Sequence, residues 1–254
     1  MWESLLPLTA MVAAFSRPGL DTGLSRLREN MTTLSELAEV AIRSAVDGLE
    51  RSDSDQAGNV FTLDREIYAI KEKIIRSCIP LLALYAPVAC DLRTITASME
   101  IAVDLDRIGR YSKDIAEVIP RLNGISPPPT STSADLNRLG GLTIEMVTTA
   151  LTSFLHQDPE LVRDIVEHDD AIDDLYDQLF QEIVADIANN AIAPRVGANY
   201  ILVDRYFERL ADHAVNIGQH VIYMVTGDRP PTSRPARPAY AIPTASVAPS
   251  PQPS

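Results

Sequence analysis

The 254-residue chain has little of what several protein classes require. Its 22 Lys and Arg stand against 35 Asp and Glu, and a net charge of −13 argues against a nucleic-acid-binding protein. Two cysteines, Cys78 and Cys90, are too few for a disulfide scaffold, so we expect a cytoplasmic protein. Aromatic residues make up only 6%, and no apolar run approaches the roughly 18 residues of a membrane-spanning helix. These features favour a helical bundle with an aliphatic core.

The sequence also lacks the motifs of common enzyme classes. It has no glycine-rich phosphate loop, no Gly-x-Ser-x-Gly elbow and no Cys-x-x-Cys pair. None of its histidines follows a glutamate by three residues, as the ferritin-like di-iron enzymes require. His168 continues an apolar stripe, which favours a packed imidazole over a phosphorylated one. The sequence thus predicts a protein that is not an enzyme.

Apolar residues at steps of three and four predict six helices. The expected helices run from Asp21 or Thr22 to Leu49, from Ser54 past Leu81, and over Asp91–Ile119, Ala134–His156, Asp158–Asn189 and Val196–Thr226. Asp91 and Asp158 are candidate N-caps, Gly227 is a candidate stop, and Pro80 should kink the second helix.

Proline marks the segments outside the helices. Residues 229–254 hold eight of the 18 prolines and no acid, which predicts a disordered tail. Residues 1–20 lack the basic flank of a secretory signal and form an N-terminal extension. Between them we expect two bundles, residues 21–120 and 134–228, joined by a proline-rich linker over residues 121–133.

The two predicted bundles repeat one pattern. Asp64 and Ile67 match Asp169 and Ile172 at a shift of 105 residues. Three positions of the third helix match the sixth at a shift of 102 residues, namely Asp106 with Glu208, Ile108 with Leu210 and Ile115 with Ile217. Such duplication predicts an all-α fold of two similar three-helix bundles about a pseudo-twofold axis.

Acidic residues recur at helical spacing in the second half. Four-residue steps in the sixth helix connect Asp204, Glu208, Asp212, Asn216 and His220, and the fifth helix carries Glu167, Asp169, Asp170, Asp173, Asp174 and Asp177. Like charges one turn apart destabilise an isolated helix by a few tenths of a kcal/mol per pair. Two such faces would offer oxygen ligands to Mg, Mn, Fe or Zn. A solvated acidic face explains the same spacing, and spacing alone favours it.

Three stretches carry a resemblance to a known family. APVACDLR (Ala86–Arg93), DLDRIGRYSKDIAEVI and FERLADHAVNIGQHVIYMVTGD resemble the PhoU family of phosphate-uptake regulators, in both halves and in order. The resemblance implies a cytoplasmic, non-enzymatic, often dimeric protein that represses phosphate-starvation signalling. It also implies two partners: the ATPase of a phosphate-specific ABC transporter and, in bacteria, a sensor histidine kinase.

Some members of that family bind iron or other metal clusters through Glu/Asp-x-x-x-Asp motifs. The resemblance therefore implies one metal site per chain, on the second bundle, at Asp169, Asp173, Glu208, Asp212 and Asn216. In the first half Tyr68 and Arg110 replace the second acids, and Arg110 can pair locally with its helix neighbours. This leaves a weaker or lost site at Asp64, Asp106 and Asp114.

Two other classes stay open. A metal-carboxylate bundle with an enzymatic or storage role would use the same acids, and turnover with iron and oxygen would identify it. A phosphotransfer protein would instead be labelled at His168 by a phosphorylated kinase.

Overall fold

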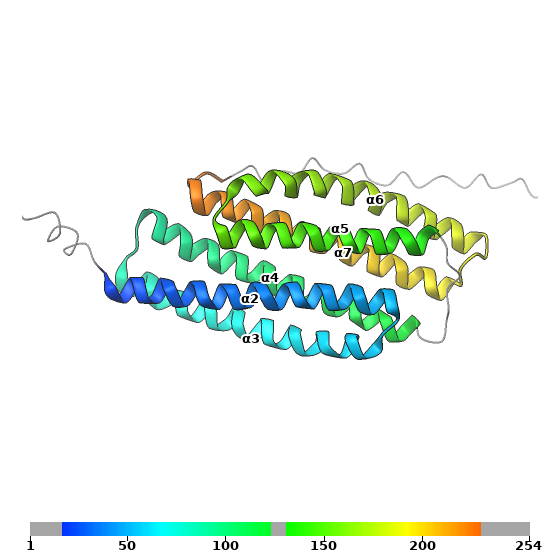
Figure 1. Cartoon of the computed structure of the whole chain (residues 1–254), viewed down its shortest axis with the longest axis horizontal. Helices are drawn as coiled ribbons and strands as arrows, with labels where there is room; N and C mark the ends of the chain where they lie inside the picture. The colour runs from blue at the N-terminus through cyan, green and yellow to red at the C-terminus, as the bar shows by residue number, and fades with distance from the viewer. Residues whose placement is uncertain (1–16, 123–130, 230–254) are drawn as a thin grey trace, which may run out of the picture.

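The computed structural model describes residues 17–122 and 131–229, and in these ranges every regular element is a helix (Figure 1). The elements are α2 (Pro18–Arg51), α3 (Ser54–Tyr85), α4 (Ala89–Leu122), α5 (Ser131–His156), the short 3₁₀ helix η1 (Pro159–Leu161), α6 (Val162–Ala188) and α7 (Pro194–Thr226). None of the helices described is apolar over a stretch long enough to span a membrane.

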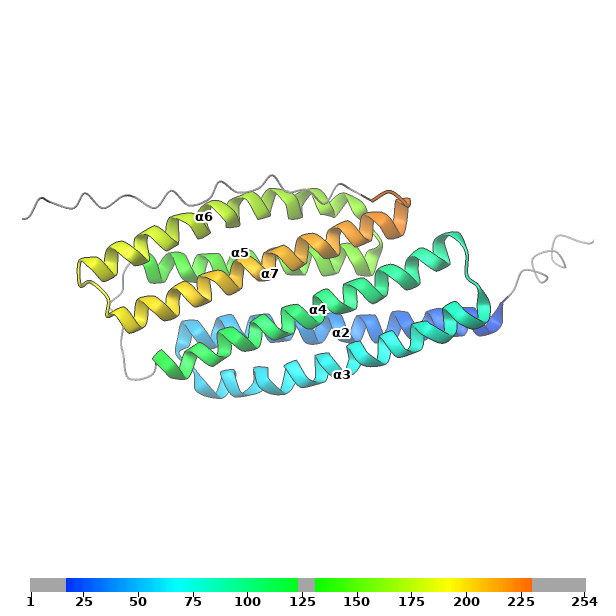
Figure 2. The same cartoon turned by 180° about the vertical axis from the view of Figure 1, so that it is seen from behind.

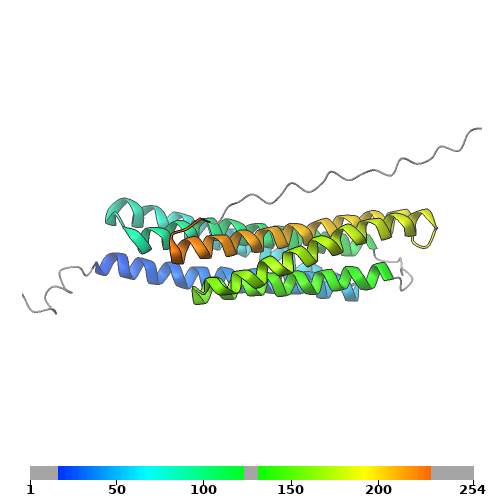
Figure 3. The same ribbon diagram turned by 90° about the horizontal axis from the view of Figure 1, so that it is seen from above.

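The helices form two three-helix bundles lying side by side, α2–α4 and α5–α7, as the sequence predicts (Figures 1 and 2). The bundles meet mainly where α4 packs along α7, with a smaller contact between α2 and α5. Seen from above, α2 and α5 lie on one side of the elongated molecule and α4 and α7 on the other (Figure 3).

All six predicted helices are present, but several begin or end elsewhere. Helix α2 begins at Pro18, since proline suits the first turn, where no backbone donor is needed. Helix α4 begins at Ala89, so Asp91 lies in its first turn and is not its N-cap. Helix α5 begins at Ser131, and Pro120, expected in the linker, lies inside α4. The predicted tail from residue 230, residues 1–16 and linker residues 123–130 lie outside the described residues.

Two predicted end signals are confirmed. The Asp158 carboxylate accepts a hydrogen bond from the Glu160 backbone N–H at 3.0 Å and opens η1, which leads into α6. Gly227, with φ 87°, closes α7 in the left-handed conformation that glycine adopts without steric cost. Helix α3 continues through Pro80.

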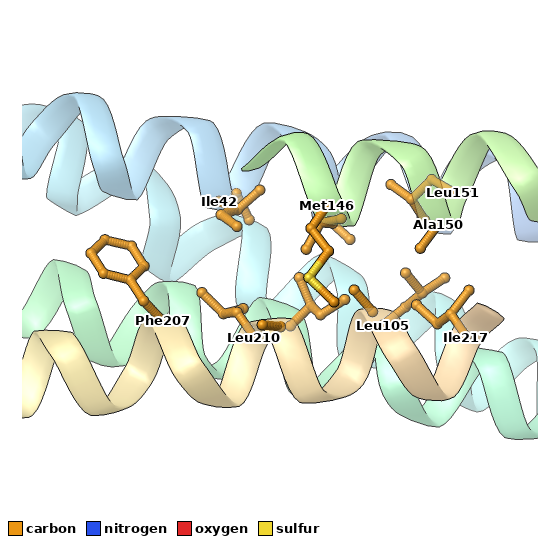
Figure 4. Packing of buried hydrophobic residues seen from close by; sticks show 14 of the residues in the cluster. Ile42, Leu105, Met146, Ala150, Leu151, Phe207, Leu210 and Ile217 are labelled. Carbon is orange, nitrogen blue, oxygen red and sulfur yellow. The ribbon is translucent and has the colours of Figure 1, made fainter. Parts of the chain in front are cut away.

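A single aliphatic core joins the two bundles. Ile42 of α2, Leu105 of α4, Met146 of α5 and Leu210 of α7 are all fully buried and pack together (Figure 4). Burying such a side chain stabilises the fold by about 1.5–3 kcal/mol. The halves therefore share one core across the contact between them.

Two arginines close the ends of the α4–α7 contact. Arg93, near the start of α4, donates through Nε to the Met224 carbonyl at 3.2 Å, and Arg195, near the start of α7, donates through Nη2 to the Arg121 carbonyl at 2.8 Å. The last carbonyls of a helix lack intrahelical partners and carry partial negative charge. Positions 93 and 195 correspond at the 102-residue shift, so the pseudo-twofold makes the same contact twice and α4 and α7 run antiparallel.

We predict that Arg93→Ala and Arg195→Ala each lower the free energy of unfolding by about 1 kcal/mol, because each leaves a carbonyl without its charged donor. The double variant should lose the sum of the two free-energy changes, since the two contacts lie at opposite ends of the α4–α7 contact. Urea denaturation measures the loss. Arg163→Ala, which removes only a surface pair with Glu160, is the control, and an equal loss there would contradict the capping role.

Candidate functional site

The acidic residues expected to bind metal come from two helices that pack together, α6 and α7. Asp169 on α6 and Glu208 on α7 are buried, whereas Asp173 and Asp212 are half-buried. These four residues therefore lie on two adjacent helices of the second bundle, and we call them the α6–α7 acids (Figure 2 shows the two helices).

Arginines of α7 already contact two of these acids. Glu208 Oε2 lies 3.3 Å from Arg205 Nη1 and 3.5 Å from Arg209 Nε, and Asp212 Oδ2 lies 3.2 Å from Arg209 Nη1. Arginines therefore contact acids in the second half as well, although none of them replaces an acid there as Arg110 does in the first half. The second half still has more acids than bases here, because Asp169, Asp173 and Asp177 of α6 and Asp204 of α7 join the pair that contacts the arginines.

Asp204 is the deepest of these carboxyl groups. It is 0% exposed, and neither carboxylate oxygen has a hydrogen-bond partner. Burial, reinforced by the negative charges of Glu208 and Asp177, raises the pKa of Asp204 to about 8. Burial, with a smaller contribution from these two neighbouring acids, therefore favours the protonated form of Asp204 at neutral pH.

The carboxylate oxygens of Asp169, Asp173, Glu208 and Asp212 fit a hard cation, since such ions prefer oxygen ligands of this kind. Within the described residues, however, no three His, Cys, Asp or Glu side chains are already arranged to hold a metal ion. Binding a cation would require side-chain shifts, above all of the arginines that contact Glu208 and Asp212.

In the first bundle, basic residues neutralise the corresponding acids. Arg110 Nε on α4 lies 3.5 Å from Asp64 Oδ1 on α3, and Lys71 Nζ lies 3.8 Å from Asp106 Oδ2. Arg110 thus forms an ion pair between helices, which the sequence did not predict, while its charge also acts on Asp114 of its own helix, as expected. Lys113 is the basic partner of Asp114, at 3.9 Å.

A second polar cluster, which the sequence did not predict, lies between α4 and α7. Asp104 Oδ1 is 2.8 Å from His213 Nδ1, and Asp104 Oδ2 is 3.4 Å from His220 Nε2, whose Nδ1 is 3.0 Å from Glu100 Oε2. Asn216 Nδ2 approaches Asp104 Oδ1 at 3.4 Å, so this expected metal ligand points its amide nitrogen toward α4.

Burial alone would raise the pKa of Asp104, but its hydrogen bonds with His213 and His220 lower it below its ordinary value. The sequence did contain a signal for this cluster. Asp104 lies on the buried apolar stripe of α4, together with Ile101, Leu105 and Ile108. An acid on a core-facing stripe indicates a buried polar partner.

The repeat shows that two different chemistries occupy one symmetric position. At the 102-residue shift Asp104 corresponds to Tyr206, and Tyr111 corresponds to His213. The structure pairs Asp104 with His213 and Tyr111 with Tyr206, the ring centroids being 6.1 Å apart. His213 also stacks on Tyr111 at 5.8 Å, so the ionic and aromatic contacts adjoin.

We predict that Asp104→Asn lowers the free energy of unfolding at pH 7 by about 2 kcal/mol, because a charge-assisted hydrogen bond becomes neutral. A lowered carboxyl pKa stabilises the fold above the ordinary value of 3.8, and this stabilisation is lost as the pH falls below it. The variant should therefore lose less stability in acid than the unmodified chain. Urea denaturation from pH 7 to 3 checks this, with the exposed Glu29→Gln as control. Identical acid profiles would contradict it.

For Asp204 the sign is opposite. Its raised pKa means that the folded state holds a proton which the unfolded chain releases near pH 4, so stability falls as the pH rises from about 4 to 8. Asp204→Asn should flatten this decline, whereas Asp170→Asn, an exposed acid on α6, should leave it unchanged. The free energy of unfolding measured at pH 5 and pH 8 tests this. A loss of stability between these pH values that persists in Asp204→Asn would show that Asp204 is not its cause.

Comparison with known proteins agrees with this architecture. A family model described as the PhoU domain matches twice, over residues 31–119 and 136–221, once in each bundle. The chain is 32% identical over 207 residues to phosphate-specific transport system accessory protein PhoU homolog 2 of Mycobacterium tuberculosis, covering 82% of this chain and 96% of that protein. It is 30% identical over 211 residues to the PhoU homolog of Xylella fastidiosa, covering 82% and 86%.

Two crystal structures have the same fold. The structure of PhoU from Pseudomonas aeruginosa superposes with a TM-score of 0.78 at 29% identity, covering 82% of this chain and 99% of that one. The phosphate transport system regulatory protein PhoU from Streptococcus pneumoniae gives a TM-score of 0.76 at 25% identity, covering 84% and 99%. The family model, the relatives and the duplicated bundles together show that the chain belongs to the PhoU family.

Proposed function

We propose that this protein regulates phosphate uptake by binding and not by catalysis. Its relatives are named accessory proteins of the phosphate-specific transport system, and one structural neighbour is named a regulatory protein. The proposed partners are the ATPase of the phosphate-specific ABC transporter and a sensor histidine kinase, with the chain acting as a cytoplasmic homodimer that represses phosphate-starvation signalling.

The observation that carries the binding site is a difference between the two halves. Asp64 and Arg110, which form an ion pair between α3 and α4, correspond by the repeat to Asp169 and Asp212 of α6 and α7. The second bundle thus has two acids where the first has an acid and a base. A cation between α6 and α7 would supply the positive charge that Arg110 supplies in the first bundle.

We accordingly propose a divalent or iron-type cation at Asp169, Asp173, Glu208 and Asp212. Fe, Mn, Mg and Zn all suit carboxylate oxygens. A bound cation would supply positive charge and link α6 to α7. Arg205 and Arg209 neutralise part of the acidic charge, and Glu208 and Asp212 would have to leave these arginines to hold a cation. The charge that this face presents to a partner then depends on the cation.

Deleting the gene should raise phosphate uptake and starvation-gene expression in cells grown with ample phosphate, because the repressing contact is lost. Radiolabelled phosphate uptake and a reporter of a starvation promoter measure the effect. Expression of the unmodified chain from a plasmid should restore repression. Uptake that stays at the parental level in the deletion strain would argue against a regulatory role.

The Glu208→Ala, Asp212→Ala double variant should lose bound metal, while Asp106→Ala should retain it, because Asp106 already lies beside Lys71. Elemental analysis of purified protein, after loading with each candidate metal in turn, gives the metal content per chain. Circular dichroism confirms that each variant is folded. Equal losses in the two variants would show that the first bundle contributes to the site.

A further inference from the structure

Four large apolar side chains between residues 79 and 92 are exposed, on the end of α3, in the turn that follows it and on the first turn of α4. Leu84 is 74% exposed, Val88 64% and Ile79 57%, and Leu92 on the first turn of α4 is 40% exposed. Single exposed apolar residues are ordinary, but several large ones close together in the chain offer a surface that another segment could cover. We call these four residues the apolar turn.

The fold does not require exposed apolar residues at such a turn. The corresponding turn between α6 and α7 begins with Asn189 and Asn190, whose amides suit water. In the apolar turn, Ala86 and Ala89 have φ angles of 41° and 48°, in the left-handed region that costs a residue with a Cβ about 1–2 kcal/mol. The chain thus keeps Val88 exposed between two residues whose own backbone conformations are unfavourable.

The N-terminal segment of the same chain arrives beside the apolar turn. Arg17 Nη1 donates a hydrogen bond to the Tyr85 carbonyl at 3.0 Å, and Gly19 packs directly against the Tyr85 ring. The start of α2 therefore lies against the end of α3, next to Leu84 (Figure 1). Residues 1–16 must leave the described structure from this point.

The composition of residues 1–16 matches the apolar turn. The segment reads MWESLLPLTAMVAAFS, has one charged residue, Glu3, and contains Trp2, Leu5, Leu8, Val12 and Phe15. Fully extended, 16 residues span about 50 Å, so every one of these side chains can reach Leu84 from Arg17. We propose that residues 1–16 dock their apolar side chains on the apolar turn of the same chain.

Docking gives this end of the molecule a cover that competes with any partner. Burying apolar side chains is worth about 25 cal/mol per Å² removed from water, and a covalently attached segment does so at high effective concentration. A partner that binds at the apolar turn must first displace residues 1–16.

Tryptophan fluorescence of the full chain tests this proposal, because Trp2 is the only tryptophan. Docking predicts a blue-shifted Trp2 emission and several-fold weaker acrylamide quenching than in urea. The Leu84→Ser, Val88→Ser double variant should shift the emission to that of the unfolded chain. Val166→Ser, an exposed residue of α6 that is 51% accessible, is the matched control and should change nothing.

A dye on Cys90 supplies a second, positional readout. Cys90 is exposed beside the apolar turn, whereas Cys78 is buried and its burial raises its thiol pKa to about 11, so labelling is selective. Energy transfer from Trp2 to the dye should be high in the unmodified chain and low in the Leu84→Ser, Val88→Ser variant.

Three results would overturn the proposal. Emission and quenching that match the unfolded chain would show that the segment does not dock. Protection of Trp2 that the double variant leaves intact would place the segment elsewhere. Protection and energy transfer that vanish on dilution would show that the segment of a second copy, not of the same chain, covers the turn.

Discussion

The antiparallel contact between α4 and α7 is the constraint on which the rest of the molecule depends. It joins two bundles through a shared aliphatic core, and two arginines related by the repeat close its ends. Asp104 lies within it, held by His213 and His220. Because an unpaired buried carboxylate is costly, this cluster is stable only while the two bundles stay together. The face formed by α3, α4, α7 and α6 exists only in that state (Figure 2).

Duplication explains why the α4–α7 contact is symmetric at its ends and why the two bundles differ elsewhere. The arginine caps have stayed alike, but matched positions elsewhere hold different chemistry, so Asp104 with His213 on one side corresponds to Tyr206 with Tyr111 on the other. The same divergence gives an ion pair at Asp64 in one bundle and an acid pair in the other. One bundle thereby pairs an acid with a base at these positions, while the other has acids at both, and burial beside Glu208 and Asp177 raises the pKa of Asp204.

Periodicity was enough to predict the helices, the duplication and the two bundles, because all three follow from which residues recur on one face. It could not give the rotation of one helix against the next. Asn216, in step with Glu208 and Asp212, therefore seemed a ligand of the same site, yet its amide approaches Asp104. Likewise Arg110 pairs with Asp64 of the neighbouring helix α3, because tertiary packing selects among nearby acids. The pair of Arg205 with Glu208, three residues apart on α7, by contrast follows from sequence spacing.

Direct binding to the transporter tests the central claim, that this chain regulates phosphate uptake by association. The purified full chain should be titrated against the phosphate-specific ABC transporter of the same organism in lipid nanodiscs, with empty nanodiscs as the control. The account predicts saturable binding to the transporter-containing discs alone. Binding that is absent with metal-loaded and metal-free protein alike, or equal for empty discs, would contradict it.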